Sequence, residues 1–362
     1  MDRERRRRAK REIVSLCHSG LDVETMLGET MRAVSRFIPY DRICWHTVDP
    51  TTLLFTSATQ ENLGHEPRLP TYEYAIADVN KWTHLAHQPK PVGVLSEATH
   101  GHPEQSPRFR DLLAPRGISH ELRASFVSDH QCWGYLGIYR DRGRSDFSDD
   151  DVAFMLDIDA QIAQGMRRAL LIGAVTSPTR DAPTPGVVLV DSSGQISGLT
   201  TAAQELLDQL AGARRVRAQL PQPVLAVAAQ ARRAASGADD ASPARSRVRT
   251  ATGQWLVLHG TQLGNSASAD TAVIIEAARP AELAELVVLA YGFSPRERDI
   301  TRLVLLGYST TRIAQELRLS PFTVQDYLKS IFEKVGVRSR RDLVATVFRD
   351  TYWPRVLAGA EN

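Results

Sequence analysis

The sequence contains few cysteines and no long apolar run. Its three cysteines, Cys17, Cys44 and Cys132, are odd in number and far apart in a chain of 362 residues. This spacing excludes a disulfide framework and a CxxC metal or redox motif. No apolar run approaches the roughly 18 to 20 residues that span a bilayer, and charged residues rather than an apolar secretory core follow Met1. We therefore expect a cytoplasmic protein that has no membrane partner.

The sequence also lacks a dominant charge. Lys and Arg number 44 against 42 Asp and Glu, so the formal net charge is only +2. This balance does not mark the whole chain as a binder of nucleic acid or of a membrane surface. The hydrophobic content of 43% and the charged content of 24% are close to globular averages, and the length predicts two or three domains. Charge must therefore be examined segment by segment.

Known catalytic motifs are missing too. The chain has no GxxxxGK[ST] phosphate loop, no GxSxG nucleophile elbow and no HExxH zinc pair, and its carboxylates form no recognisable catalytic set. The strand-end acidic residues and matching lysine of a phosphoacceptor receiver domain are not seen either. We predict that the protein is not an enzyme, with an enzyme inside the first module as an alternative.

Changes in periodicity and composition predict a multidomain chain in which two α+β modules precede an all-α segment. The expected segments are a basic N-terminal helix (1–20), a first α+β module with a closing helix (21–175), a Pro-rich linker (176–185), a second α+β module (186–280), a connecting helix (281–293), an all-α segment (294–349) and a C-terminal tail (350–362). The closing helix should begin after Ser148, a capping residue followed by three aspartates. The basic helix admits two interpretations, because its arginines could bind phosphate or only form a solvated face.

Capping residues mark four helix starts in the all-α segment. Short polar side chains accept hydrogen bonds from the unpaired amides of a first helical turn, and four serines precede such turns: Ser294, Ser309, Ser320 and Ser339. Ser294 also begins a Ser-Pro-Arg-Glu sequence, which is a capping box with proline at the first helical position. The segment is therefore predicted to hold four helices of about a dozen residues each.

The third of these helices has two distinct faces. At 100° per residue its apolar residues form one stripe for burial: Val324, Leu328, Ile331 and Val335. The opposite face carries mostly hydrogen-bonding side chains: Phe322, Gln325, Asp326, Lys329 and Glu333. The segment from Ser294 to Arg349 holds eleven basic and six acidic residues, a net charge of +5. This pattern is typical of a recognition helix that enters the major groove of DNA.

Several blocks of this segment resemble the LuxR-type helix-turn-helix. They occur in family order, without a gap, over about 55 residues: Phe293-Ser-Pro-Arg-Glu, Gly307-Tyr-Ser, Ile313-Ala-Gln-Glu-Leu, Leu319-Ser-Pro-Phe-Thr-Val and Lys334-Val-Gly-Val-Arg-Ser-Arg. The resemblance implies a four-helix DNA-binding domain whose third helix reads the major groove and whose fourth often mediates dimerisation. The alternative is a four-helix cap with a solvated basic face.

The resemblance assigns DNA contacts to six residues. Three would read bases and three would lie near phosphates: Gln325, Asp326 and Lys329, then Thr323, Arg338 and Arg340. Chemistry allows each base-reading role, since Gln pairs with adenine, Asp accepts from cytosine and Lys donates to guanine. Two positions depart from the family pattern, because Arg312 replaces a usual acidic residue and Tyr327 replaces a common histidine. Either change could alter phosphate contacts or only packing.

The first α+β module resembles a GAF domain. The resemblance rests on three stretches: Tyr40-Asp-Arg-Ile-Cys-Trp-His, Trp133-Gly-Tyr-Leu-Gly-Ile-Tyr and Phe147-Ser-Asp-Asp-Asp. The second module resembles a PAS domain through Gly186-Val-Val-Leu-Val-Asp-Ser-Ser-Gly, the helix that follows it, and late strands around Trp255 and Ile274. Both families imply a small antiparallel sheet that encloses a ligand or serves only as a dimerising spacer.

Six residues of the first module are candidates for the wall of a ligand pocket: Cys44, Trp45, His46, Trp82, Phe126 and Trp133. The alternative is that they belong to the hydrophobic core, where aromatic residues of such sheets commonly lie. Nine of the ten histidines also precede residue 131, but no carboxylate or cysteine recurs beside them at a ligand spacing. We therefore predict no metal site and no evident cofactor, and leave an unknown small-molecule ligand open.

Together these features predict a transcription regulator that binds specific DNA sequences. The two sensor-like modules would respond to a signal or mediate dimerisation, and would thereby control the helix-turn-helix. The expected partners are double-stranded DNA, a second copy of the chain and RNA polymerase. Arg outnumbers Lys 39 to 5, which indicates a GC-rich and hence bacterial genome. The alternative function is a small-molecule or haem-binding sensor that acts through protein partners.

Overall fold

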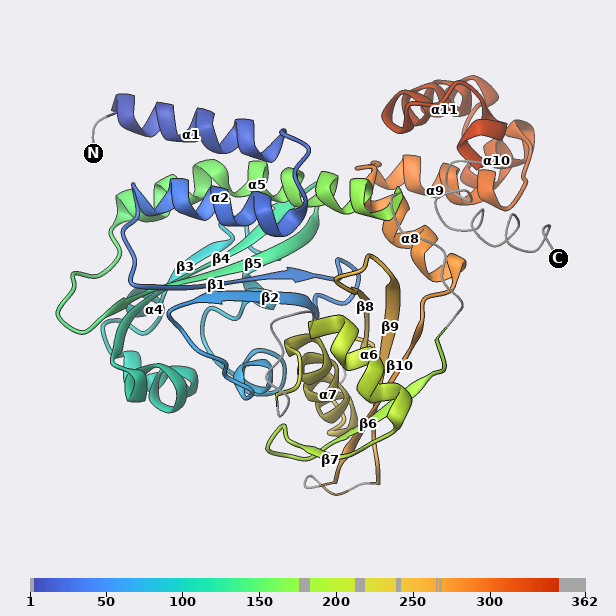
Figure 1. Ribbon diagram of the computed structural model, residues 1–362. Helices are drawn as coiled ribbons and strands as arrows, with labels where there is room; N and C mark the ends of the chain where they lie inside the picture. Colours follow the sequence, from blue (N-terminus) through green and yellow to red (C-terminus); the bar gives the residue numbers. More distant parts are fainter. Residues whose placement is uncertain are drawn as a thin grey trace. The chain divides into compact units, whose positions relative to one another are not determined.

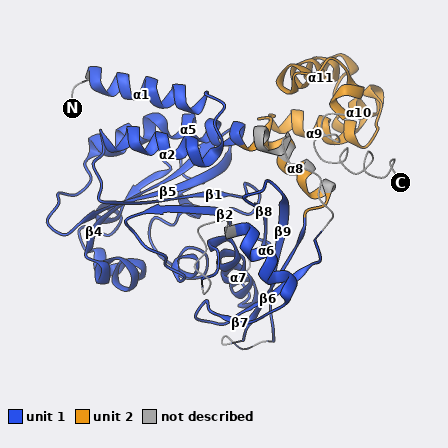
Figure 2. Ribbon diagram, viewed as in Figure 1, with its two compact units in different colours: residues 1–169, 182–277 blue, residues 170–181, 278–362 orange. Residues whose placement is uncertain are grey.

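The computed structural model describes residues 3–175, 183–211, 219–238, 242–264, 266 and 269–344. The chain forms two compact units, which Figure 2 colours separately. The first comprises residues 1–169 and 182–277, and the second comprises residues 170–181 and 278–362. None of the described helices is long and apolar enough to cross a membrane.

The first unit contains a five-stranded antiparallel sheet in the order β2-β1-β5-β4-β3. Its strands are β1 (Arg42–Val48), β2 (Phe55–Glu61), β3 (Val92–Val94), β4 (Ile118–Ser128) and β5 (Gln131–Asp141). The long strands β4 and β5 meet in a two-residue turn in which Asp129 and His130 have φ values of 51° and 61°. Positive φ at both positions matches the twist of a tight hairpin. The central strand β5 is buried along nearly its whole length, so both faces of the sheet are covered.

Three helices lie on one face of this sheet, with α1 outermost and packed against α2 (Figure 1): α1 (Arg3–Cys17), α2 (Val23–Ser35) and α5 (Asp149–Val175). The buried residues of α1 recur at helical spacing: Ala9, Ile13 and Cys17. Gly165 allows α5 to approach the other two helices, because a Cβ there would lie 2.6 Å from Met26 Sδ and 2.9 Å from Cys17 Cβ. We call these three helices the helix layer.

Short helical segments and loops cover the opposite face: η1 (Thr71–Ala75), α3 (Trp82–Leu85), α4 (Leu95–Ala98), η2 (Pro103–Gln105), η3 (Phe109–Leu113) and η4 (Ala114–Arg116). Trp82 anchors this covering, since its side chain is fully buried and its Nε1 donates to the Leu136 carbonyl at 2.8 Å. The covering segments are thus attached to the sheet by an indole ring.

A second five-stranded antiparallel sheet repeats the strand order of the first, as β7-β6-β10-β9-β8. Its elements are β6 (Gly186–Val190), β7 (Ile196–Leu199), α6 (Thr201–Ala211), α7 (Gln222–Ala235), β8 (Arg245–Arg249), β9 (Trp255–Gln262) and β10 (Thr271–Ala277). Gly260 allows α7 to lie close to β9, because a Cβ there would meet the carbonyl oxygen and Cγ1 of Val227 at 2.8 Å. The alanine-rich sequence of α7 suits this close packing.

Helix α7 joins the two sheets into one core. It lies against β9 and β10 of its own sheet and against η1 and β2 of the first. Its residues from Gln222 to Ala231 are all buried. One cluster of buried apolar side chains extends from Tyr139 in the first sheet to Ile275 in the second. The two modules that the sequence predicts thus lie in one compact unit and share a core.

A buried ion pair also connects the two sheets. The guanidinium of Arg247 in β8 lies 2.6 Å and 2.7 Å from the two carboxylate oxygens of Asp49, and both side chains are 2% exposed. Burial alone would raise the pKa of Asp49, but Arg247 holds it below its ordinary value. Two charges removed from water in this way tolerate little change in geometry.

The second unit contains α8 (Pro280–Ala290), α9 (Pro295–Leu305), α10 (Thr310–Leu317) and α11 (Pro321–Val335), and a further helix begins at residue 340. The four predicted starts are confirmed, since each serine hydroxyl accepts from a backbone N–H three residues on: Ser294 from Glu297, Ser309 from Arg312, Ser320 from Thr323 and Ser339 from Asp342. The predicted fold class of α+β sheets followed by an all-α helix-turn-helix is confirmed.

Two other predictions about the course of the chain can be compared with the structure. The closing helix of the first module is confirmed as α5, and the Ser148 hydroxyl accepts from the backbone N–H of Asp151 at 3.3 Å. Residues 176–182 of the predicted linker, the end of the fourth helix after residue 344 and the predicted tail at 350–362 lie outside the described residues.

Candidate nucleic-acid interface and sensor interior

Helix α11 presents a polar face that the rest of its unit leaves uncovered. Its apolar stripe packs into the core of the second unit: Val324, Leu328 and Ile331. Gln325, Asp326 and Lys329 are exposed on the opposite face. Among the described residues, none of these three side chains forms a hydrogen bond or an ion pair. The structure thus brings the three predicted base-reading residues together on one accessible surface.

The three residues predicted near phosphates differ in accessibility. Thr323 is half-buried, and its hydroxyl lies 2.8 Å from Ser320 Oγ, so it reinforces the cap of α11. Arg340 is also half-buried, and its guanidinium donates to the carbonyl of Tyr308. Arg338 is exposed in the segment that follows α11. Of the three, Arg338 has the side chain most accessible to a partner.

The two departures from the family pattern have local structural roles. The Arg312 guanidinium carbon lies 3.8 Å from the centre of the Tyr308 ring, a cation–π contact between α10 and the turn before it. Tyr327 is half-buried against the core of the second unit. Both residues therefore contribute to packing within the unit.

A buried carboxylate joins α9 to α11. Glu297 is 4% exposed and accepts from the Ser294 backbone N–H at 2.6 Å, from Ser330 Oγ at 2.7 Å and from Lys334 Nζ at 2.6 Å. Burial alone would raise the pKa of Glu297, but these donors hold it below its ordinary value. The sequence indicated the capping box but gave no signal for the partners in α11, which are 33 and 37 residues away.

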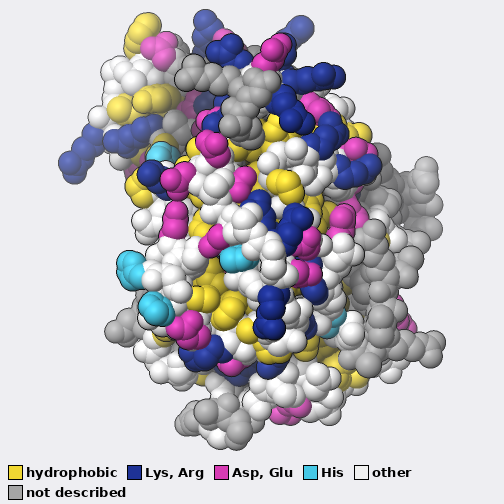
Figure 3. All heavy atoms as spheres, turned by 90° about the vertical axis from the view of Figure 1, so that its left-hand side faces the viewer, with side chains coloured by type: hydrophobic (Ala, Val, Ile, Leu, Met, Phe, Trp, Pro, Cys, Tyr) yellow, Lys and Arg dark blue, Asp and Glu magenta, His cyan; other side chains and the backbone are white. Residues whose placement is uncertain are grey.

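The basic helix α1 is partly engaged within its own unit. Arg6 pairs with Asp157 of α5 at 2.5 Å, while the other described arginines of the run are exposed: Arg5, Arg7, Arg8 and Arg11. Figure 3 shows Lys and Arg side chains interspersed with Asp and Glu over the face that it presents. Phosphate binding and a solvated face both stay predictions for this helix.

Three of the six predicted pocket residues lie together, on the face of the first sheet away from the helix layer. Cys44 and His46 come from β1, and Trp82 comes from α3. The His46 ring stacks on Phe55 with 4.1 Å between centroids and lies 5.3 Å from the Trp82 ring. Cys44 Sγ lies 3.4 Å from the Tyr139 hydroxyl.

The other three predicted pocket residues do not belong to this group. Trp45 lies between two of its members in β1 and so points to the opposite face of the sheet. Phe126 pairs with Gly134, which faces Met166 of the helix layer. Trp133 lies at the bulge of β5. All three are buried, and their role in a pocket wall stays a prediction.

Aromatic rings fill the space around His46. Trp82 stacks on Tyr135 with 5.5 Å between centroids, and Phe55 packs edge-on against both rings. The Arg123 guanidinium carbon lies 3.7 Å from the centre of the Trp82 ring. Burial, together with the charge of Arg123, lowers the pKa of His46 to about 3. His46 is therefore neutral at pH 7.

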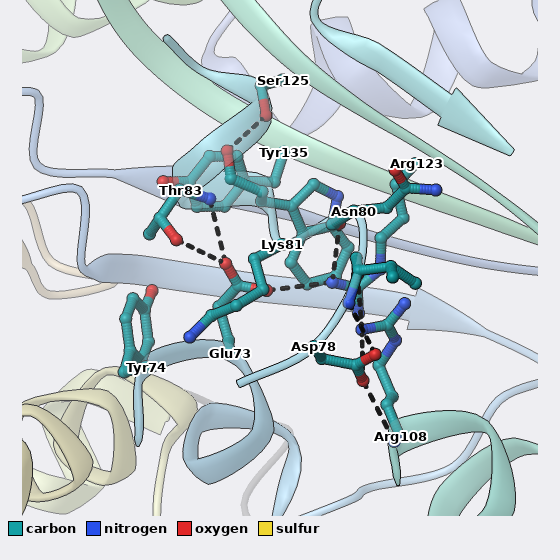
Figure 4. Close-up of polar contacts among 12 residues, drawn as sticks. Glu73, Tyr74, Asp78, Asn80, Lys81, Thr83, Arg108, Arg123, Ser125 and Tyr135 are labelled. Atoms are coloured by element: carbon teal, nitrogen blue, oxygen red, sulfur yellow. Dashed lines mark hydrogen bonds and ion pairs between the residues drawn. The ribbon is translucent and has the colours of Figure 1, made fainter. Parts of the chain in front are cut away.

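Five charged side chains beside these rings form a connected buried network, shown in part in Figure 4. Arg108 pairs with Asp78 at 2.9 Å and with Glu121 at 2.7 Å. Arg123 pairs with Glu121 and with Glu73, both at 2.9 Å. Each side chain is at most 1% exposed. Burial alone would raise the pKa of Glu121, but the two guanidinium groups hold it below its ordinary value.

The cysteines are placed as structural residues. All three are unpaired and buried, and burial raises the pKa of Cys17 and of Cys44 to about 11 and that of Cys132 to about 12. They are therefore protonated and weakly nucleophilic at neutral pH. Within the part of the chain that the structure describes, no group of three His, Cys, Asp or Glu side chains could hold a metal ion.

Capped helices followed by a helix with an exposed polar face have the architecture of a helix-turn-helix DNA-binding domain. Residues 292–347 match the family described as "Bacterial regulatory proteins, luxR family", and residues 22–166 match the GAF domain family. The chain therefore contains a luxR-family helix-turn-helix and, before it in sequence, a GAF domain, and both predicted resemblances are confirmed. The PAS resemblance of the second sheet stays a prediction.

The similar curated proteins are named as regulators of transcription. The "Probable HTH-type transcriptional regulator GfsR" of Streptomyces halstedii is 49% identical over 47 residues, which cover 13% of this chain and 19% of that protein. The "Probable transcriptional regulatory protein NarL" of Mycobacterium tuberculosis is 38% identical over 56 residues, or 16% of this chain and 26% of that protein. Relatives from Mycobacterium bovis and M. tuberculosis are 47% identical over 51 residues, only 6% of their own length. The chain thus matches a small part of each relative.

Two solved structures overlap with larger parts of the chain. The crystal structure of Escherichia coli SdiA covers 95% of this chain and 97% of its own, with 11% identity and a TM-score of 0.31. The phycoerythrobilin-bound GAF domain of a cyanobacterial phytochrome covers 46% of this chain and 96% of its own, with 16% identity and a TM-score of 0.34.

Proposed function

We propose that the protein is a sequence-specific DNA-binding transcription regulator of bacterial origin. The observation that carries this proposal is the outer face of α11, where Gln325, Asp326 and Lys329 are exposed within a luxR-family helix-turn-helix. Side chains that are accessible and unpaired on a recognition helix are available for hydrogen bonds to base edges. Its activity is binding rather than catalysis, and it acts in the cytoplasm, where the chromosome is accessible.

The proposed contacts divide by chemistry. Gln325 pairs with adenine, Asp326 accepts from cytosine, and Lys329 donates to guanine. Arg338 contacts a phosphate. Arg340 and Thr323 also lie near phosphates, but both form hydrogen bonds within the domain. Their main contribution is therefore to stabilise the local structure of the interface.

The first unit is proposed to control this interface. The GAF domain at 21–175 and the PAS-like sheet at 186–280 respond to a signal or mediate dimerisation, on either side of the linker at 176–185. The strand order shared by the two sheets supports the PAS-like assignment. A homodimer places two recognition helices on two half-sites, and contact with RNA polymerase converts binding into a change in transcription.

Selection of duplexes from a random-sequence library by the full-length chain tests this proposal. We expect a motif of two related half-sites, bound more weakly as salt rises. Lys329→Ala should cost about 1 to 3 kcal/mol of binding free energy and relax the preference at one base pair. The measurement is fluorescence anisotropy at two salt concentrations.

Arg302→Ala is the matched control. Arg302 is exposed on α9, so its replacement also removes one positive charge from the domain. It should leave the selected motif unchanged. Selection of no motif, or equal effects of the two variants on base preference, would contradict base reading by α11.

A further inference from the structure

Phe322 is the most exposed large apolar side chain among the described residues. Its exposed fraction is 72%, and the other large apolar side chains with notable exposure are Leu306 at 61%, Leu263 at 44%, Leu199 at 39% and Ile274 at 37%. Burial of a phenyl ring is favourable, so a ring left in water forgoes that free energy. The core of the second unit takes up Phe293 and has Phe332 packed against it, but it leaves Phe322 outside.

The position of Phe322 is fixed by the start of α11. Phe322 is the second residue of the helix, directly after the cap at Ser320 and the proline at the first helical position. At 100° per residue, it lies about 20° around the helix from Lys329 and within about 60° of Gln325 and Asp326. Phe322 therefore shares the face of the base-reading residues, one turn closer to the N-terminus.

The N-terminal part of a recognition helix is the part that contacts base edges. A phenyl ring has no hydrogen-bonding group, and the apolar feature that a base displays in the major groove is the 5-methyl group of thymine. We propose, on the basis of the function proposed above, that Phe322 contacts this methyl group. Phe322 thereby selects a T·A pair beside the pairs read by Gln325 and Asp326.

The surroundings of Phe322 favour DNA over a protein partner. The centre of a protein interface is depleted in charged residues and contains several apolar ones. Phe322 is instead surrounded on its face by the exposed polar side chains of Gln325, Asp326 and Lys329. A single apolar group among hydrogen-bonding groups matches the edge of a base pair, which displays a methyl group beside donors and acceptors.

Replacement of thymine by deoxyuracil tests the contact, because it removes only the methyl group. Each thymine of the selected duplex is replaced in turn, and the affinity of the full-length chain is measured by fluorescence anisotropy. One replacement in each half-site should weaken binding of the unaltered protein about fourfold, as expected for loss of one buried methyl group. The same replacement should have no effect on Phe322→Ala.

Leu306→Ala is the matched control, because Leu306 is also strongly exposed in the second unit but lies at the end of α9. For Leu306→Ala, each replacement of thymine by deoxyuracil should change the affinity by the same factor as for the unaltered protein. If every replacement of thymine by deoxyuracil weakens binding of Phe322→Ala by the same factor as binding of the unaltered protein, the contact does not exist. In that case the selected motif and the effect of Lys329→Ala still support DNA binding. If no motif is selected, the proposed function and the contact both fail.

Discussion

The polar side chains on the outer face of α11 and those in the interior of the GAF domain differ in both exposure and pairing. On α11, Gln325, Asp326 and Lys329 are exposed and make no polar contact among the described residues. Inside the GAF domain, Arg108 and Arg123 are buried and paired with carboxylates. Groups that are bonded within the fold determine its stability, whereas groups left unpaired on a rigid helix are available to a partner. The following changes test this division.

The largest expected effect is that of Arg123→Ala. This change leaves the buried carboxylates of Glu73 and Glu121 without one of their cationic partners. We expect a loss of about 3 to 5 kcal/mol in the free energy of unfolding, because an unpaired buried charge is strongly destabilising. Urea denaturation measures the loss. Arg32→Ala, which breaks an exposed pair with Glu29, should change stability by less than about 1 kcal/mol.

The neutral histidine of the interior predicts a pH effect. The pKa of His46 is about 3 in the fold and 6.5 ordinarily, so the unfolded chain binds a proton that the folded chain excludes. Stability from this group is therefore fully present above pH 6.5 and falls as the pH drops, by about 1.5 to 2 kcal/mol between pH 6.5 and 5. His46→Gln should remove this part of the slope in urea titrations at several pH values.

A second buried group acts in the opposite direction. Burial, and secondarily the charge of Asp157, raises the pKa of Asp159 to about 6, so its contribution grows as the pH falls from about 6 towards 3.8. Comparison of the unaltered protein with His46→Gln cancels this term. Equal slopes for the two proteins between pH 6.5 and 5 would show that folding does not lower the pKa of His46.

Two glycines distinguish tight from loose packing. Gly260→Ala forces a Cβ against the backbone of Val227, and we expect a loss of about 1 to 3 kcal/mol from overpacking. Gly28→Ala in α2 meets no atom within 4 Å and should instead stabilise the helix by about 0.5 to 1 kcal/mol. Thermal unfolding compares the two variants. A neutral result for Gly260→Ala would mean that α7 can move away from β9.

The smallest expected effect on stability is that of Asp326→Ala. Its carboxylate is exposed on α11, so the free energy of unfolding should change by no more than about 0.5 kcal/mol. The same change should strengthen binding to unrelated DNA, because it removes a negative charge beside phosphates, and should relax the preference at one base pair. Anisotropy with selected and unrelated duplexes measures both. A large loss of stability would show that Asp326 stabilises the fold and is not simply available to a partner.

Features set by neighbouring residues could be predicted from the sequence. The serine caps of α9, α10 and α11 depend on hydrogen bonds that span three residues, and all of them occur where expected. The division of α11 into a buried apolar stripe and an exposed polar face follows from the helical period alone. The strands β1 and β5 could also be predicted, because both contain consecutive apolar residues, although His46 of β1 and Arg140 of β5 are buried as well.

Features that depend on distant partners could not be predicted. Glu73, Asp78, Arg108, Glu121 and Arg123 form their network only after segments up to 50 residues apart are folded together. The burial of α7 is another example. The alanine-rich sequence of this helix shows no clear apolar face, and its close packing depends on Gly260, which lies in a distant strand. Cys44, His46 and Trp82 lie together in the structure, but the sequence could not separate them from Phe126, because the face on which Phe126 lies depends on the strand register.

The position of α7 has a consequence for dissecting the molecule. A fragment that ended after α5 would hold every strand of the GAF domain, yet the surfaces of η1 and β2 that contact α7 would be left in water. Exposed apolar surface of this kind promotes aggregation. We therefore expect residues 1–277 to remain monodisperse where the shorter fragment aggregates, and chimeras that exchange the sensor should be joined after β10 rather than at the proline-rich linker.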